Sequence, residues 1–230
     1  FFKQKTAYEI YQCDWSSDVC SSDLAARPAL AAERRVAFPA QGASWSFTVP
    51  TEIPKGVVAL YWPTTDANEI QRTRRLTILS SIFNDRLRVK VREELGGAYS
   101  PAAGNSSSDT FTGYGYMLAN VIIDPPAAAT IASAVRLIAA DLQRNGVTED
   151  ELNRAKQPIL TNVRESARTN AYWIGSVVNK AQEKPEVLDW ARSRQADFES
   201  ISRAEVDALA REYLVPDRSF QVTVLPEGKK

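Results

Sequence analysis

The sequence LTILSSIFNDRLRVKVREELGGAYS, residues 76–100, changes its periodicity at a pair of glycines and thereby decides much of the fold. Before the glycines, large apolar residues recur at intervals of three or four, as on one face of an α-helix: Leu76, Leu79, Phe83, Leu87, Val91 and Leu95. Gly96 and Gly97 end the pattern, because glycine readily adopts the left-handed conformation that commonly closes a helix. The stretch predicts a long helix, running from residue 66 onward, that ends at the glycines and leads into a strand.

Strand patterns lie on both sides of this helix. Residues 44–49, SWSFTV, alternate Trp45, Phe47 and Val49 with small polar residues, which predicts a half-buried strand. Residues 56–62, GVVALYW, form a continuous apolar run that is typical of a central strand. Residues 98–124 read as a hairpin whose second arm spans 111–123. The glycines at 113 and 115 of that arm indicate a bulge or a close approach of two backbones.

The C-terminal half of the chain carries mainly helix signals. After two prolines at 125 and 126, an apolar stripe predicts a helix: Ile131, Val135, Ile138 and Leu142. Two capping boxes, in which a hydroxyl residue is followed three positions later by a glutamate, predict two helix starts: Thr148 with Glu151, and Ser202 with Glu205. Residues 170–198 are expected to be helical with a break near Pro185, and Pro158 is expected to kink its helix.

The order of these predicted elements indicates the fold class. Two strands, a long helix, a hairpin, several helices and a last strand at 219–226 follow one another in blocks rather than in strict alternation. This order is typical of an α+β, two-layer domain with a mostly antiparallel sheet packed against several helices.

The first 24 residues do not fit this pattern. Residues 3–24, KQKTAYEIYQCDWSSDVCSSDL, resemble the translation of a common short-read sequencing adapter, and we exclude them from the fold. A hairpin closed by a disulfide between Cys13 and Cys20 is the alternative interpretation. The predicted organisation is a non-native segment at 1–24, a linker at 25–43 and one domain at 44–227.

Composition excludes several classes of function. The chain of 230 residues contains no histidine, and both cysteines lie within residues 1–24. Residues 25–230 therefore lack the usual zinc ligands and cannot form a Ser-His-Asp or Cys-His site. A phosphate-binding P-loop is absent, and GYGYML at 113–118 lacks the third glycine of a dinucleotide-binding loop. No apolar run approaches the ~20 residues of a membrane-spanning helix.

Charge argues against a polyanion as partner. Residues 1–24 hold two of the 28 basic and four of the 28 acidic residues, which leaves 26 basic and 24 acidic side chains. A basic run in the long helix is either a nucleic-acid-binding stripe or a solvated helix face: Arg72, Arg74, Arg75, Arg86, Arg88, Lys90 and Arg92. Four acidic residues interleave with the run, which favours the solvated face, and we expect no nucleic-acid partner.

Arg92 and Tyr99 are the candidate site residues. They lie seven positions apart around the glycine turn, and they offer a permanent cation and a neutral O–H donor. Such a pair can bind a peptide carbonyl and stabilise the oxyanion that forms when water attacks it. A structural interpretation is also open, because an arginine in a last helical turn complements the helix dipole and tyrosine is a favoured strand residue.

The sequence around this pair resembles a known family. RLRVKVREELGGAYS at 86–100 closely resembles the C-terminal domain of the pitrilysin/insulinase family of zinc metallopeptidases. GVTEDELNRAK at 146–156 resembles the family's helix start after a glycine turn, and NAYWIGSVV at 170–178 is similar to a stretch of larger periplasmic members. AREYLVPDRSFQVTVLPE at 210–227 resembles the closing helix and strand. The resemblance covers nearly all of residues 45–226.

This resemblance implies one half of an enzyme. In the family, an N-terminal half carries H-x-x-E-H and a further glutamate, which bind Zn²⁺ and activate water, and the C-terminal half faces it across a chamber that encloses peptides. Arg92 would hold the substrate carbonyl, and Tyr99 would donate to the developing oxyanion. Edge strands between 100 and 122 would hold the substrate backbone by strand addition.

The chain departs from the family in lacking the zinc motif, which truncation explains. The resemblance implies a zinc metalloendopeptidase of the bacterial periplasm, or alternatively of the cytoplasm, whose C-terminal fragment is inactive alone and binds no cofactor itself. The expected partners are the zinc-bearing N-terminal half and peptide substrates. A non-catalytic structural or partner subunit is the alternative function.

Overall fold

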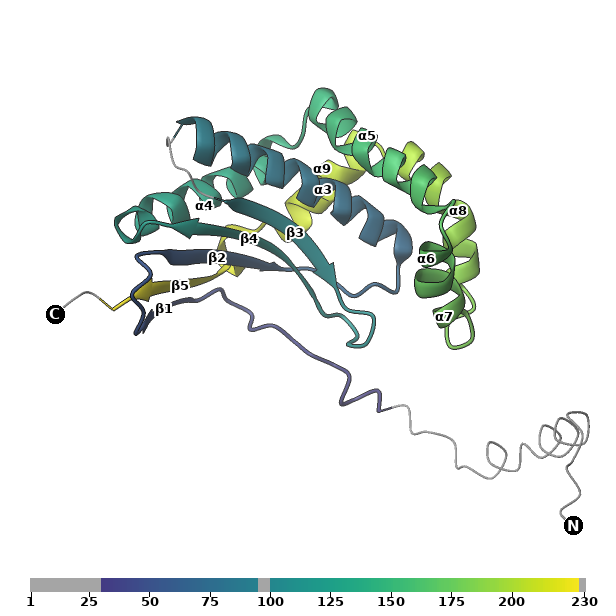
Figure 1. Ribbon diagram of the computed structural model, residues 1–230, viewed down its shortest axis with the longest axis horizontal. Helices are drawn as coiled ribbons and strands as arrows, with labels where there is room; N and C mark the ends of the chain where they lie inside the picture. Colours follow the sequence, from purple (N-terminus) through teal and green to yellow (C-terminus); the bar gives the residue numbers. More distant parts are fainter. Residues whose placement is uncertain (1–29, 95–99, 228–230) are drawn as a thin grey trace, which may run out of the picture. The chain divides into compact units, whose positions relative to one another are not determined.

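The computed structural model describes residues 30–94 and 100–227 (Figure 1). The chain divides into two units, residues 1–33 and residues 34–230. In the first unit, the described residues 30–33 lie at an exposed turn. Every helix and strand named below belongs to the second unit.

Five strands of the described residues form one mixed sheet in the order β1-β5-β2-β4-β3. Their bounds are β1 Ser44–Val49, β2 Gly56–Pro63, β3 Pro101–Ser107, β4 Gly115–Ile123 and β5 Phe220–Pro226. Only β1 and β5 pair in parallel; the other neighbours are antiparallel. The predicted central strand, the predicted hairpin and the predicted last strand are therefore confirmed.

Helices fill the remainder of the second unit. The long helix is α3 Ile70–Arg88, continued by a π-helical turn, η1 Val89–Glu94. The later helices are η2 Pro125–Ala127, α4 Ala128–Asn145, α5 Glu149–Ser166, α6 Asn170–Tyr172, η3 Trp173–Val178, α7 Asn179–Ala181, α8 Val187–Ser200, α9 Arg203–Tyr213 and η4 Pro216–Arg218. Both predicted capping boxes are present, at Thr148 and at Ser202. The expected break near Pro185 separates α7 from α8, and α5 continues on both sides of Pro158.

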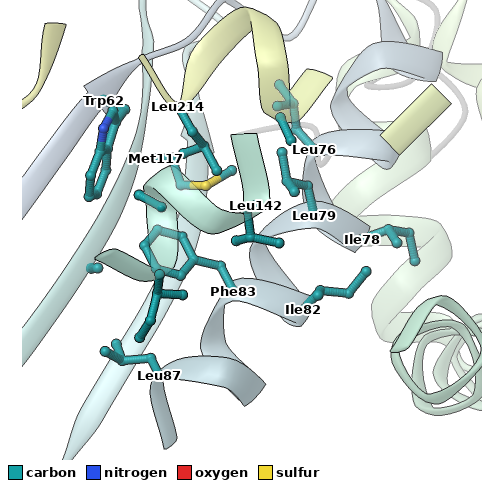
Figure 2. Packing of buried hydrophobic residues seen from close by; sticks show 14 of the residues in the cluster. Trp62, Leu76, Ile78, Leu79, Ile82, Phe83, Leu87, Met117, Leu142 and Leu214 are labelled. Atoms are coloured by element: carbon teal, nitrogen blue, oxygen red, sulfur yellow. The ribbon is translucent and has the colours of Figure 1, made fainter. Parts of the chain in front are cut away.

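The core lies between one face of the sheet and the helices that cover it. Figure 1 shows α3 and α4 crossing this face, and the cluster joins buried sheet residues to the predicted stripe of α3 (Figure 2). Trp62 of β2 meets Phe83 of α3 edge to face, with ring centroids 5.6 Å apart. Burial of one such large apolar side chain contributes about 2 kcal/mol, so this stripe holds the long helix on the sheet.

Helix α3 is also buried on the side that faces away from the sheet. Ile78 and Ile82 are almost completely buried, and Figure 2 shows them directed away from Phe83 and Leu87. The helices α5 and α8 pack on this second side. The apolar pattern in the sequence indicated only the side of α3 that packs on the sheet. In the structure α3 has a second buried side, which packs against other helices.

The strand β1 corrects one expectation. All six of its residues are exposed, including Trp45 at 45% and Phe47 at 53%, so the prediction of a half-buried strand is wrong about burial although the strand itself is present. The register places Trp45 and Phe47 beside Val222 and Val224 of β5. On the other side of β5, these two valines lie beside Ala59 and Val57 of β2. These residues alternate with the core-facing ones, so they lie on the sheet face that the core helices do not cover.

Gly115 confirms the predicted close approach of two backbones. A Cβ atom at this position would lie 2.1 Å from the backbone oxygen of Thr65, a separation that no side chain tolerates. The Gly115 oxygen accepts a hydrogen bond of 2.7 Å from the N–H of Thr64. The start of β4 is thereby tied to the segment that leads from β2 into α3.

Candidate functional site

Arg92 lies in the π-helical turn η1, at the end of the long helix. Its side chain is exposed, whereas Val91 beside it and Leu87 one turn earlier are completely buried. Two buried neighbours therefore fix the turn that presents Arg92 to solvent. Short π-helical segments are rare and occur frequently at functional sites. Tyr99, the second predicted residue, lies outside the described residues.

A set of interactions at Arg86, named here the Arg86 clamp, holds the end of α3 in place. The guanidinium donates from Nε to Glu151 Oε1 at 2.7 Å and from Nη2 to Glu151 Oε2 at 2.9 Å. It also donates from Nη1 to Asp141 Oδ2 at 2.6 Å and from Nη2 to the backbone oxygen of Gly146 at 2.9 Å. Charge-assisted, bidentate pairs of this kind are among the strong hydrogen bonds of proteins. The clamp ties α3 to the end of α4 and the start of α5.

Glu151 serves two elements at once. Its carboxylate accepts hydrogen bonds from Arg86 and also from the N–H of Thr148, at 2.8 Å, in the capping box of α5. The hydrogen bond from Arg86 is the main cause that lowers the pKa of Glu151 from 4.5 to about 2. The carboxylate therefore stays ionised, and the clamp stays intact, throughout the neutral range.

Strand β3 follows the site in sequence, and its outer edge is partly occupied. The side-chain oxygen of Asn84 on α3 accepts a hydrogen bond of 3.0 Å from the backbone N–H of Ala103. Pro101, at the start of the strand, has no N–H to donate. An added peptide strand would thus find few free donors on the first half of β3.

The basic run of α3 is not a solvated face. Arg74 is only 5% exposed and pairs with Asp197 at 2.9 Å, and Arg75 is paired with Asp197 at 3.0 Å and with Glu205 at 2.8 Å. Together with the Arg86 clamp, these pairs link α3 to α4, α5, α8 and α9. The expectation of a solvated face is wrong for Arg74, Arg75 and Arg86, because they project from the side of α3 that packs against other helices. It stays correct for Arg88, which is exposed.

The described residues contain no group of three or more histidine, cysteine, aspartate or glutamate side chains that could hold a metal ion. The chain that the structure describes therefore does not fit a zinc site of its own. Among the same residues, no helix combines the length and the apolar character needed to cross a bilayer.

Two features of this molecule were missed by sequence reasoning. One is the exposed apolar face of the sheet, where Trp45 stacks on Phe220 with centroids 6.1 Å apart and Phe38 stacks on Tyr114 at 5.1 Å. The alternation in β1 singled out Trp45 and Phe47 but predicted that they would be buried, whereas both are exposed. The other is a groove beside the first half of α3. Its lining residues come from five separate elements, so no local sequence pattern indicates it.

Comparison with known proteins identifies the family of this chain. Residues 21–159 match the family model described as the peptidase M16 inactive domain. The stromal processing peptidase of chloroplasts from Pisum sativum is 32% identical over 98 residues, which is 43% of this chain and 8% of that protein. The matched segment therefore spans less than a tenth of the length of this curated relative.

Solved structures of other proteins share the fold. The peptidase M16 inactive domain from Pseudomonas fluorescens superposes with a TM-score of 0.68 at 18% identity, over 85% of this chain and 47% of that one. The periplasmic protease PqqL from Escherichia coli also gives a TM-score of 0.68 at 18% identity, over 82% of this chain and 21% of that one. At this identity the likeness establishes the α+β fold alone.

Proposed function

We propose, from the premise that the chain belongs to the peptidase M16 inactive-domain family, that it is the C-terminal, substrate-binding half of a zinc-dependent endopeptidase of the pitrilysin/insulinase type. The zinc ion would be held by an N-terminal half, and there it would activate the attacking water. The chain contains no histidine and no metal-binding cluster among its described residues, so its own contribution is to bind and orient the peptide.

The exposed position of Arg92 carries this proposal. Arg92 follows a helix that is fixed by the Arg86 clamp and by buried Leu87, and it projects to solvent from a π-helical turn. A permanent cation on a rigid support suits the task of holding a peptide carbonyl oxygen, because little side-chain ordering is left to be done during the reaction. Arg92 would bind the scissile carbonyl of the substrate.

Tyr99 is proposed as the second donor. Its place in the sequence, between η1 and β3, is the basis for this role, since the residue itself lies outside the described part of the chain. The phenol O–H would donate to the oxyanion that develops when water attacks the carbonyl. Loss of one such donor typically costs about 3 kcal/mol of transition-state stabilisation.

The uncovered face of the sheet supports the pairing with another half. Trp45, Phe47 and Ile122 are each at least 44% exposed on or beside this face, and exposed apolar patches mark interaction surfaces. A facing zinc-bearing half, with peptide enclosed between the two, would cover the surface. The proposed substrates are therefore peptides, and the proposed partner is the zinc-bearing half in the same chain or in another.

The remaining proposals concern origin and location. Residues 1–24 are proposed to be adapter-derived, with a linker at 25–43 and the domain at 44–227, although the family match begins at residue 21. The periplasm of a bacterium is the proposed location, supported by the periplasmic solved structure with this fold, and the cytoplasm is the alternative.

A non-catalytic partner subunit is the second candidate function. The description of the matching family as an inactive domain favours it. In that case the chain would stabilise or complete a zinc-bearing subunit without touching the reacting carbonyl. Arg92 would then serve only as a cation at a helix end.

Mixing experiments separate the two functions. The full chain is combined with the zinc-bearing N-terminal half of a bacterial M16 peptidase, association is measured by sedimentation velocity, and cleavage of a fluorogenic peptide is followed. We expect association and zinc-dependent cleavage that requires both halves. Association with cleavage that is unchanged by the chain would favour the non-catalytic partner, and failure to associate would contradict both functions.

A further inference from the structure

A groove of about 610 Å³ opens beside the first half of α3, in the region where Figure 1 shows α6 and α8 beside the end of α5. Its lining comes from α3, α5, α6 with η3, and α8. Groove volumes of roughly 300–1,000 Å³ are typical of sites for small organic ligands. The groove lies away from Arg92, which is at the other end of the same helix, and no role proposed above uses it.

One cation in this groove is not neutralised. Arg194 of α8 donates one hydrogen bond, to Ser166 Oγ at 3.0 Å, and its guanidinium carbon lies 4.8 Å from the centroid of the Tyr172 ring. Within residues 30–94 and 100–227 it forms no ion pair with a carboxylate. A guanidinium has five N–H donors, so most of those on Arg194 remain available to a ligand.

Arg74, which also lines the groove, is neutralised within the fold. It donates to Asp197 Oδ2 at 2.9 Å and to the backbone oxygen of Trp190 at 2.6 Å. Asp197 is shared with Arg75, which has Glu205 as a second partner. These two carboxylates balance the two arginines of α3, so the surplus positive charge of the groove belongs to Arg194.

The rest of the lining combines apolar walls with free polar groups. Val177 and Val187 are buried, and Trp190 and Phe198 add aromatic surface. Asn162 and Ser176 also line the groove, and their side chains have no hydrogen-bond partner in the described part of the chain. A purely aliphatic ligand would leave these polar groups unused, whereas a peptide backbone would supply both donors and acceptors for them.

We propose that this groove binds the C-terminal carboxylate of a peptide that ends in an apolar residue. The carboxylate would pair with Arg194 in a bidentate manner, the last side chain would pack against Val177 and Val187, and the amide groups would bond to Asn162 and Ser176. Such a site is separate from the reacting carbonyl. The proposal does not depend on Arg92, on Tyr99 or on zinc.

The probe for the test is N-acetyl-leucyl-phenylalanine, titrated into the full chain while two-dimensional NMR follows the indole N–H signals. We expect saturable shifts of the Trp190 signal, which a Trp190→Phe variant assigns, and no shift at Trp45. The C-terminal amide of the same dipeptide should bind at least roughly tenfold more weakly, because it lacks the charge that Arg194 recognises.

Two matched variants make the result specific. Arg194→Gln should weaken binding of the free acid roughly tenfold or more, and Arg194→Lys should restore part of it. Arg192→Gln is the control, because Arg192 lies on the same helix but is exposed and paired with Asp189 at 2.7 Å. It should change the affinity by less than about twofold. Melting temperatures of all variants verify that they fold.

Any one of four outcomes would overturn the proposal. The first is equal affinity for the free acid and the amide. The second is an Arg194→Gln affinity within about twofold of the parent in a folded protein. The third is no saturation of the parent at roughly 10 mM probe. The fourth is tighter binding of decanoate, added as a competitor, than of the dipeptide, which would identify the groove as a fatty-acid site instead.

Discussion

Arg86 and Arg74, near the two ends of α3, are neutralised within the fold, whereas Arg194 of α8, which lines the same groove as Arg74, is not neutralised by any described residue. At the end near η1, Arg86 donates to two carboxylates and a backbone oxygen, so its hydrogen-bonding capacity is largely consumed inside the fold. At the other end, Arg74 is similarly engaged, while Arg194 across the groove has one hydroxyl and one ring as partners. An arginine that is paired with carboxylates inside the fold stabilises the structure. An arginine without a carboxylate partner is available to bind a ligand.

Arg86→Met should produce the largest loss of stability among these arginines. The substitution leaves Glu151 and Asp141 without their cation and removes the link between three helices. Loss of one partner from a largely buried pair costs about 3 kcal/mol. Urea denaturation measures the change, with Arg88→Met as the control, since Arg88 is 54% exposed and its pair at 3.7 Å is long. A similar loss for both variants would contradict the assignment of Arg86 as a structural clamp.

Acid should weaken the same clamp in a defined range. The pKa of Glu151 is about 2 in the folded chain and 4.5 without its partners. A carboxyl group whose pKa is lower in the folded state stabilises the fold at pH values above its unfolded pKa. This contribution is lost as the pH falls from about 4.5 to about 2. Allowing for solvent screening, about 2 kcal/mol should disappear over this range. Unfolding free energies measured at several pH values should show this slope in the parent and a flatter one in Arg86→Met.

Arg74 and Arg194 provide the sharper contrast inside the groove. Arg74→Met should cost about 2 kcal/mol, because it removes two strong hydrogen bonds from a buried site, although Asp197 keeps Arg75 as a partner. Arg194→Met should cost no more than about 0.5 kcal/mol. Thermal and urea unfolding compare the two. A greater loss for Arg194 than for Arg74 would reverse the comparison and make Arg194 a structural residue.

The smallest effect is expected from the N-terminal segment. Deletion of residues 1–24 should shift the melting temperature by no more than a few degrees, because the sequence of that segment carries no signal of the fold. Differential scanning calorimetry of the two forms measures the shift. A larger fall would show that the segment is part of the native domain and would contradict its adapter origin.

Local patterns in the sequence predicted most of the fold. The three- and four-residue spacing in α3 and α4 identified the stripes that face the sheet, and both capping boxes were located at the residue level. The glycines at 113 and 115 predicted a bulge or a close backbone approach, and at Gly115 the structure has such an approach, to the backbone of Thr65. Each of these features depends on residues close together in the chain, or on a backbone constraint that one residue type satisfies.

Features that depend on distant residues were not predicted. Arg86 and Glu151 are 65 positions apart, so nothing in the spacing of α3 indicates that its arginines are paired. The exposure of all six residues of β1 depends on which distant elements pack against the strand, and alternation within the strand cannot reveal this. The groove that Arg194 lines joins residues of five elements, which are distant in the sequence. Of the candidate site, the sequence located Arg92 at a helix end but not the π-helical form of that end.

The kinetic effect of Arg92 tests the central claim most directly. In the assembly of the full chain with a zinc-bearing half, kcat/KM for peptide cleavage is measured for Arg92→Lys, with Arg88→Lys as the matched control on the same helix. We predict a fall of roughly 100-fold for Arg92→Lys, carried mainly by kcat, and less than about twofold for Arg88→Lys, with unchanged association of the halves. An Arg92→Lys assembly that cleaves peptide within about twofold of the parent would contradict the claim that this half binds the reacting carbonyl.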